Sequence, residues 1–390
     1  FYLEEVGPLS NVNKKYFNNK IDFWNKITEH PNYDDFWQKR NLLPHLKDIK
    51  PAILVVGGWF DAEDLYGPLN IYKKIETSSP GAQNFLVMGP WRHGGWTRGN
   101  GESLGNVKFS SSPSPSVFYR EKIEFPFFMQ TLKTGKNLKL AEATMYNTGE
   151  DKWRKFDQWP PSEIVIKKLF LQPDGNISET PPGNERTFRE YTSDPAKPVP
   201  FSQTISTRMT REYMTADQRF AARRPDVLVY QTVILEEDLT LAGKIEANLF
   251  VSISQTDSDW IVKLIDVYPN DTPNNEFTAT NMHMGGYQQM VRSEVFRGRF
   301  RNSYEFPEPF IPGEITAVSF PLQDVLHTFK KGHRLMIQIQ SSWFPIVDRN
   351  PQKYVENIFN AEEEDFVPSI QRVYSFGVQA SHIEINVLED

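Results

Sequence analysis

Two short apolar runs constrain the fold of this 390-residue chain more than any other feature. The runs at 52–56 (AILVV) and 85–88 (FLVM) contain no polar residue, which is typical of strands buried on both faces of a parallel sheet. Residues 65–76, between them, have the length and pattern of a crossover helix. Because neighbouring parallel strands need such a crossover, the sequence predicts a strand–helix–strand unit and therefore an α/β fold.

Each predicted strand runs into a turn that carries one ionisable residue. Asp61 follows the first strand, and His93 follows the second. Chemistry in open α/β sheets takes place at the carboxyl ends of the strands, so we expect both residues in one crevice. An Asp that orients a His after the next strand matches the last two members of a Ser–Asp–His triad in α/β-hydrolase order. We therefore predict Asp61 as the triad acid and His93 as the general base.

The serine of such a triad should precede the acid, on a G-x-S-x-G turn that follows a strand. No such motif precedes Asp61, and the match GESLG at 101–105 follows the polar residues TRGN instead of an apolar strand. We interpret Ser103 as part of a loop at the rim of the site. We expect the nucleophile on an N-terminal segment outside the 390 residues, so that the chain alone is inactive.

Composition excludes several classes of function. The net charge of −7, with both signs interspersed, argues against nucleic-acid binding. The absence of Cys excludes disulfides and thiolate nucleophiles, and no His pair has the spacing of a metal-binding helix, so we predict no metal and no cofactor. No apolar run approaches the roughly 20 residues of a membrane span, and no membrane partner is predicted.

The character of the sequence changes along the chain, and three regions are predicted. Residues 1–48 are aromatic-rich and helical, and residues 49–140 hold the strand–helix–strand unit. An amphipathic helix over 117–132 should be kinked or split in two by Pro126 and ended by KTGK at 133–136. From 141 to 390, short alternating runs separated by Gly/Pro turns predict an all-β sandwich or jelly roll.

Several longer motifs carry a resemblance to one family. They are GGWFDAEDLYG, NFLVMGPWRHGG, YNTGEDKWRKFDQWP, TDSDWIVKLIDVYP and KKGHRLMIQIQSSWFP, which in this order resemble the CocE/NonD (X-Pro dipeptidyl peptidase S15-like) hydrolases. The chain is most similar to the α-amino acid ester hydrolases and glutaryl-7-aminocephalosporanic acid acylases. The resemblance implies a helical cap remnant (1–48), the C-terminal part of an α/β-hydrolase core (49–140) and a β jelly roll (141–390). In this resemblance Asp61 and His93 match the triad acid and base, and the family's G-x-S-Y-x-G elbow is absent.

Further residues are candidates for substrate binding. The α-amino acid ester hydrolases hold the substrate's ammonium group with carboxylates, and Asp34 resembles one of these, with Asp35 as its neighbour. The alternative is that both carboxylates stabilise the start of a short helix, where negative charge is favoured. Trp59, Trp91 and Trp96 flank the predicted acid and base. They are predicted to wall off solvent, and the alternative is ordinary core and rim packing.

The resemblance implies a serine hydrolase that hydrolyses or transfers acyl groups of α-amino acid esters or β-lactam-type amides through an acyl-enzyme. Two alternatives stay open: X-Pro dipeptidyl peptidase activity, and a non-catalytic jelly-roll module that binds glycans or proteins. The expected partners are a small ester or amide, the missing N-terminal segment and a second copy of the chain. A homo-oligomer is expected because an aromatic fold with a truncated core should bury surface against another chain. Composition leaves the compartment open, and the resemblance favours a periplasmic or secreted protein over a cytoplasmic one.

Overall fold

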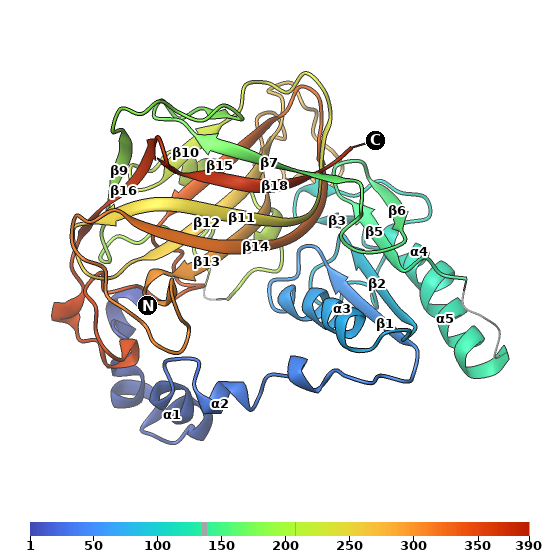
Figure 1. Cartoon of the computed structure of the whole chain (residues 1–390), viewed down its shortest axis with the longest axis horizontal. Helices are drawn as coiled ribbons and strands as arrows, with labels where there is room; N and C mark the ends of the chain where they lie inside the picture. The colour runs from blue at the N-terminus through green and yellow to red at the C-terminus, as the bar shows by residue number, and fades with distance from the viewer. Residues whose placement is uncertain (135–138, 207, 390) are drawn as a thin grey trace.

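The computed structural model describes residues 1–134, 139–206 and 208–389, with an α/β unit beside a larger strand-rich region (Figure 1). The sheet of the α/β unit has the order β1-β2-β5-β6. Its strands are β1 (Ile53–Gly58), β2 (Asn84–Gly89), β5 (Ala143–Asn147) and β6 (Lys152–Phe156). β1, β2 and β5 are parallel, and β6 runs antiparallel to β5. α3 (Tyr66–Ser78) connects β1 to β2, so the structure contains the predicted strand–helix–strand unit.

Successive residues of β2 face opposite sides of the sheet and are buried by different helices. Leu86 packs with Leu69 and Tyr72 of α3 in one cluster, whereas Val87 packs with Tyr119 and Ile123 in another. This two-residue alternation follows from the pleat of a strand. Both faces are covered, which explains why the two apolar runs contain no polar position.

The second covering element is a continuous helical stretch with changes of pitch. It consists of α4 (Pro115–Tyr119), η4 (Arg120–Glu124), α5 (Phe125–Met129) and η5 (Gln130–Thr134), of which η4 and η5 are π-helical. Pro126 has no N–H donor, and it lies in the first turn of α5, directly after η4. The predicted kink is thus a local widening into a π turn. The end predicted at 133–136 extends beyond the described residues.

The N-terminal region is less regular than its apolar spacing predicts. Its elements are η1 (Tyr2–Val6), η2 (Asn13–Phe17), α1 (Asp22–Glu29), α2 (Asp35–Gln38) and η3 (Leu43–His45). Asn18 and Asn19 have φ of 49° and 57°, so Phe17 and Trp24 lie on two separate elements and not on one helix. This region packs on loops of the strand-rich region, for example through Asn357 Nδ2, which donates to the Thr28 carbonyl oxygen (2.8 Å).

Residues 164–388, called here the two-sheet region, form two sheets around one hydrophobic core. The smaller sheet has the order β10 (Leu228–Gln231), β15 (Arg334–Gln340), β12 (Asp259–Val267) and β13 (Gln288–Arg297). The larger has the order β17 (Gln379–Ala380), β16 (Ser369–Phe376), β11 (Leu239–Ile253), β18 (His382–Leu388), β7 (Ile164–Leu171) and β8 (Ile177–Ser178). β14 (Thr316–Phe329) also pairs with β11, and β9 (Phe188–Ser193) with β16. The short elements are β3 (Ser103–Leu104), β4 (Val107–Lys108), η6 (Tyr213–Thr215), α6 (Arg219–Ala222), η7 (Gly298–Phe300), η8 (Ile358–Asn360) and η9 (Glu363–Asp365).

A second core joins the α/β unit to the two-sheet region. It contains Met88 and Tyr146 from the first and Ile261 and Trp343 from the second. Polar contacts cross the same boundary: Asp324 on β14 binds Lys73 Nζ (2.8 Å) and Trp159 Nε1 (2.8 Å). Because these groups are largely buried, the two parts form one packed structure.

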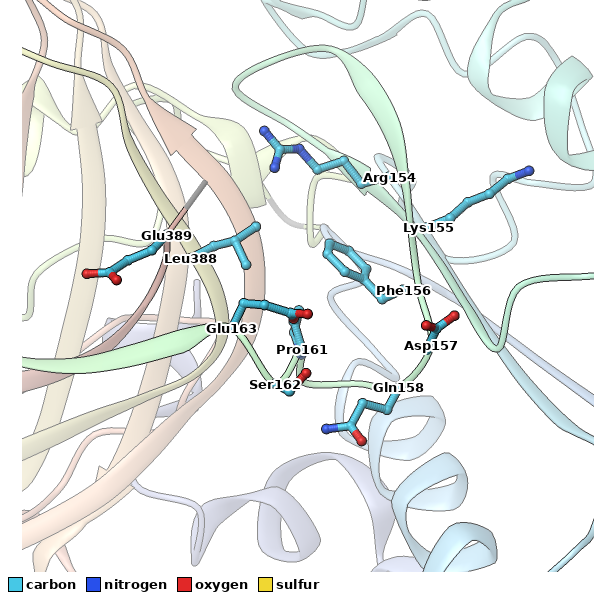
Figure 2. A pocket seen from close by; sticks show the side chains of 10 residues that line it. All are labelled: Arg154, Lys155, Phe156, Asp157, Gln158, Pro161, Ser162, Glu163, Leu388 and Glu389. Atoms are coloured by element: carbon cyan, nitrogen blue, oxygen red, sulfur yellow. The ribbon is translucent and has the colours of Figure 1, made fainter.

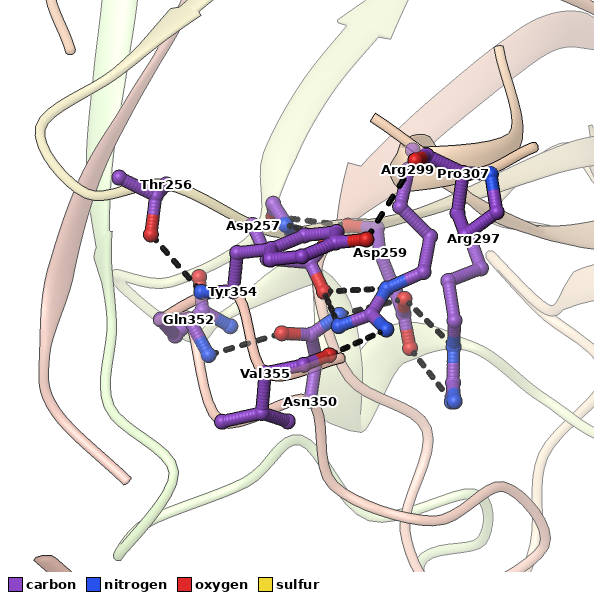
Figure 3. Close-up of polar contacts among 12 residues, drawn as sticks. Thr256, Asp257, Asp259, Arg297, Arg299, Pro307, Asn350, Gln352, Tyr354 and Val355 are labelled. Atoms are coloured by element: carbon purple, nitrogen blue, oxygen red, sulfur yellow. Dashed lines mark hydrogen bonds and ion pairs between the residues drawn. The ribbon is translucent and has the colours of Figure 1, made fainter. Parts of the chain in front are cut away.

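A buried ionic network ties the loop after β15 to β12 and β13 (Figure 3). Arg299 donates from Nε to Asp257 Oδ2 (2.9 Å), and both side chains are almost fully buried. Arg297 pairs with Asp259 and Asp348 at 3.2 and 2.7 Å. In a low-dielectric interior each guanidinium needs these partners to offset its lost hydration.

Two features are absent from the residues that the structure describes. None of their helices has the length and apolar character required to cross a membrane. In the same part of the chain, no three His, Cys, Asp or Glu side chains are grouped as metal ligands would be.

Candidate active site

The loops that follow β1 and β2 lie against each other at the carboxyl ends of the strands. Phe60 N donates to the Trp91 carbonyl oxygen (3.1 Å), and Trp59 N donates to the Gly89 carbonyl oxygen (2.8 Å). Gly58 makes this approach possible, because a Cβ at that position would lie 2.1 Å from the Trp91 carbonyl oxygen. The glycine and the two short turns therefore bring Asp61 and His93 to one place.

Asp61 and His93 form a hydrogen-bonded pair. His93 Nδ1 lies 3.0 Å from Asp61 Oδ2, and the carboxylate is 2% exposed whereas the imidazole is 51% exposed. Asp61 Oδ1 accepts from the backbone N–H groups of Glu63 (2.9 Å) and Asp64 (3.0 Å). The carboxylate is therefore fixed from both sides, and the ring is held by one edge.

This pairing defines the acid–base character of the imidazole. The hydrogen bond and the negative charge of Asp61 raise the pKa of His93 above its ordinary value, and Glu63 and Asp64 add to the effect. A carboxylate at Nδ1 favours the tautomer that carries its proton there, which leaves Nε2 as an acceptor. No described side chain donates to Nε2, and the exposed ring edge can receive a proton from a hydroxyl.

The three tryptophans occupy different environments. Trp59 is buried and donates from Nε1 to the Tyr146 carbonyl oxygen (2.8 Å), and Trp91 is buried between Tyr119 and Trp153. Trp96 packs edge-on against the ring of His93, with centroids 6.5 Å apart. Trp96 is thus the tryptophan placed beside the imidazole, and the other two support the loops that carry the pair.

Asp34 and Asp35 lie on a different element. Asp34 caps α2 by accepting from Phe36 N (2.9 Å), and it binds His30 Nδ1 at 2.6 Å. Asp35 is exposed and lies 3.2 Å from Lys39 Nζ. The structure does not bring either carboxylate into contact with Asp61 or His93, so their role in substrate binding stays a prediction.

Ser103 lies on β3, a two-residue strand that pairs with β4. No apolar strand leads into it, and the preceding Gly99 and Gly101 have positive φ, as turns require. Ser103 thus lies on a short strand and not on a loop, and this placement agrees with the prediction that 101–105 is not a nucleophile elbow.

A hollow of about 410 Å³ opens beside Asp61, where the α/β unit meets the two-sheet region. Tyr213, Met214 and Trp343 give it apolar walls. Glu63 and Glu294 also line it, and burial raises the pKa of Glu294. Its lining, taken from the described residues, contains no Lys or Arg, so the hollow is apolar and acidic.

Sequence reasoning missed the contribution of β13 to this site. Glu294 lines the hollow, and Arg292 donates from Nη1 to the Trp59 carbonyl oxygen (2.8 Å), two residues before Asp61. The available signal was the run QQMVRSEVF at 288–296, in which charged residues interrupt a β-type pattern. Inward-facing charge in a strand is uncommon and often marks a functional position.

These features define a class: an α/β unit with an acid–imidazole pair at its strand ends, packed on a two-sheet region. Residues 6–95 match the model of the X-Pro dipeptidyl-peptidase (S15) family. Residues 138–384, more than half of the chain, match the model of the X-Pro dipeptidyl-peptidase C-terminal non-catalytic domain. The chain belongs to this family, the S15-type CocE/NonD hydrolases.

Individual relatives agree with this assignment. A crystal structure of an aminopeptidase from a marine sediment Thaumarchaeota archaeon superimposes with a TM-score of 0.92 at 38% identity, over 98% of this chain and 63% of that one. An α-amino acid ester hydrolase gives 0.89 at 37% identity, with the same coverage of 98% and 63%. The cocaine esterase of Rhodococcus sp. (strain MB1 Bresler) is 26% identical over 93% of this chain and 61% of its own length. The chain thus spans about 60% of the length of these relatives.

Proposed function

We propose that this chain is part of a serine hydrolase that cleaves esters or amides of α-amino acids through an acyl-enzyme. The observation that carries the proposal is the Asp61–His93 pair, at 3.0 Å, with Nε2 open to an incoming hydroxyl. In this proposal residues 1–48 are the remnant of a helical cap, 49–140 are the C-terminal part of an α/β-hydrolase core, and 141–390 are a jelly roll.

The proposed chemistry divides the work between the two residues. His93 Nε2 takes the proton of a serine hydroxyl as its oxygen attacks the substrate carbonyl, and then returns the proton to the leaving alcohol or amine. Asp61 does not change protonation; it holds the Nδ1–H tautomer and stabilises the imidazolium. Water, activated in the same way, then hydrolyses the acyl-enzyme, and an amine such as a β-lactam nucleus can take its place.

We propose that the serine belongs to polypeptide outside the 390 residues. Among the described residues, no serine hydroxyl is hydrogen-bonded to His93. The chain spans 61% of the cocaine esterase sequence, which leaves room for such a segment in relatives. The chain by itself should accordingly not react with a fluorophosphonate, and labelling at Ser103 would contradict this part of the proposal.

The hollow beside Asp61 supports an α-ammonium acyl group. Its walls suit an apolar side chain, and its acidic groups, with no Lys or Arg among the described lining residues, suit a cation. Charge pairing of this kind is strong where solvent is excluded. The likeness to the α-amino acid ester hydrolase points to the same substrate class.

A second candidate is cleavage of an amide at a peptide N-terminus. It is favoured by the likeness to the archaeal aminopeptidase at 38% identity. The same acidic hollow would receive the peptide's terminal ammonium. The two candidates differ in the leaving group, so a matched pair of one aminoacyl ester and one aminoacyl amide distinguishes them by kcat/KM.

The test uses the chain joined to the upstream polypeptide of its own reading frame, assayed on an aminoacyl nitrophenyl ester and on its analogue without the amino group. We expect the aminoacyl ester to be preferred by about tenfold or more, as one charge pair can supply. His93→Ala should lower kcat about 10⁴-fold or more. His45→Ala, which removes an exposed imidazole elsewhere, serves as the control. Equal rates for His93→Ala and the parent would overturn the proposal.

A further inference from the structure

A separate hollow of about 770 Å³ lies on the side of the α/β unit that is remote from β1. It is enclosed by the helical stretch that begins with α4 and η4, by the hairpin of β5 and β6, and by the loop at 110–113. β6 is the edge of the sheet opposite to β1, so this hollow is distinct from the one beside Asp61.

The inner wall of this hollow is aromatic and apolar. Phe118 and Trp153 stack with ring centroids 5.0 Å apart and planes 20° from parallel. Ile123 and Leu140 add further apolar surface to the lining. The outer face of a ring in such a stack can take a further planar apolar group.

The rim of the hollow is basic. Lys122, Lys139, Lys152 and Lys155 contribute to the lining and are all exposed. Figure 2 shows the Lys155 side chain leaving β6 on the opposite side from Arg154, away from the C-terminal end of β18. Within residues 1–134, 139–206 and 208–389, none of the four ammonium groups forms an ion pair.

The two acidic residues in the lining do not neutralise this rim. Glu150 is held by Arg154, through contacts of 2.9 and 2.6 Å to its two carboxylate oxygens. Asp151 is directed inward to the Tyr146 hydroxyl (3.4 Å), and burial raises the pKa of its carboxyl. The lysine ammonium groups at the mouth of the apolar hollow are therefore not neutralised by these two carboxylates.

We propose that this hollow binds an organic anion with a planar apolar body, such as an aromatic carboxylate. The ring system would lie against the Phe118–Trp153 wall, and the anionic oxygens would face Lys122, one helical turn after Phe118, and Lys155, on the same face of β6 as Trp153. Ion pairing at a partly enclosed rim adds to burial of the ring, so the two parts of the ligand should reinforce each other. The proposal is independent of the hydrolase activity proposed above.

The test is calorimetric titration of the 390-residue chain with naphthoate, with its uncharged analogue naphthamide, and with acetate. We expect naphthoate to bind at one site per chain and about tenfold or more tighter than either of the other two. The double charge reversal Lys122→Glu and Lys155→Glu should weaken naphthoate binding by about tenfold or more. Both changes are at exposed positions, so the variant should fold normally.

A matched control reverses two exposed lysines elsewhere, Lys20→Glu and Lys47→Glu. It changes the net charge by the same amount and should leave naphthoate affinity within about twofold. The proposal is overturned if naphthamide or acetate binds as tightly as naphthoate. It is equally overturned if naphthoate does not bind at millimolar concentration, or if both double variants bind it with the same affinity.

Discussion

Arg292 on β13 donates from Nη1 to the carbonyl oxygen of Trp59, 2.8 Å away. Trp59 is the first residue after β1 and precedes Asp61 by two positions. Arg292 is 1% exposed, and burial lowers the pKa of its guanidinium to about 10. It forms no ion pair within the described part of the chain, so its desolvation is poorly offset. A contact this costly indicates that Arg292 positions the loop that carries Asp61.

Replacing Arg292 tests that positioning role. Arg292→Met keeps much of the volume and removes the hydrogen bond, so kcat of the reconstituted hydrolase should fall about tenfold with little change in KM. The free energy of unfolding should change by no more than about 1–2 kcal/mol, because relief of desolvation offsets the lost bond. Arg349→Met is the control: Arg349 is also buried and binds the Pro195 carbonyl oxygen (3.0 Å), and its loss should leave kcat unchanged. Equal effects of both changes on kcat would refute the positioning role.

The pKa of His93 should depend on its partner, Asp61. Because Asp61 raises the pKa of His93 above 6.5, NMR of the imidazole should give a midpoint above that value, and Asp61→Asn should lower it. A general base works in its neutral form, so kcat/KM should rise as pH increases through the raised pKa. The raised pKa also stabilises the fold below about pH 6.5, and this contribution is lost as pH rises through the folded-state value. An unchanged midpoint in Asp61→Asn would show that the pair does not form in solution.

Gly58 should tolerate no side chain. In Gly58→Ala the new Cβ would meet the Trp91 carbonyl oxygen at 2.1 Å, and this obstacle is backbone that cannot rotate away. We expect a loss of stability of about 1–3 kcal/mol and a displaced His93 loop. The control is Gly183→Ala, at a position with open space around it, which should be neutral or slightly stabilising. Thermal unfolding compares the two, and similar midpoints would contradict the close approach of the loops.

The buried ionic network should be sensitive to removal of one member. Arg299→Leu leaves Asp257 buried without its cation, and we expect a loss of about 3–5 kcal/mol in urea unfolding. Arg372 forms a surface pair with Glu190 at 2.9 Å, so Arg372→Leu should cost no more than about 1 kcal/mol. Equal losses would mean that solvent reaches the Asp257 carboxylate.

The strand–helix–strand unit was predictable because its signals are local. The apolar runs before Gly58 and Gly89 are uninterrupted, and the residues between them suit one crossover helix. The adjacency of Asp61 and His93 follows from the rule that parallel neighbours end at one edge. The family was likewise recognisable from motifs, and the family models support it.

Other parts depend on tertiary contacts that no local pattern shows. β13 was missed because Arg292 and Glu294 occupy strand positions where alternation predicts apolar residues. Arg292 binds the Trp59 carbonyl oxygen in the loop after β1, and Glu294 lines the hollow. β16 was missed for a similar reason, since the buried Gln371 donates from Nε2 to Gln352 Oε1 (2.7 Å) on the loop after β15, a contact that no local pattern shows. The break after Phe17 depends on left-handed Asn residues, which a helical pattern does not reveal.

The core shared by Met88 and Trp343 has a practical consequence for anyone who alters this protein. The region that matches a non-catalytic domain contributes side chains to the same interior as the loop of the predicted triad acid. A mutant library that leaves residues 164–388 unchanged would therefore omit positions such as Trp343, where substitutions should change kcat.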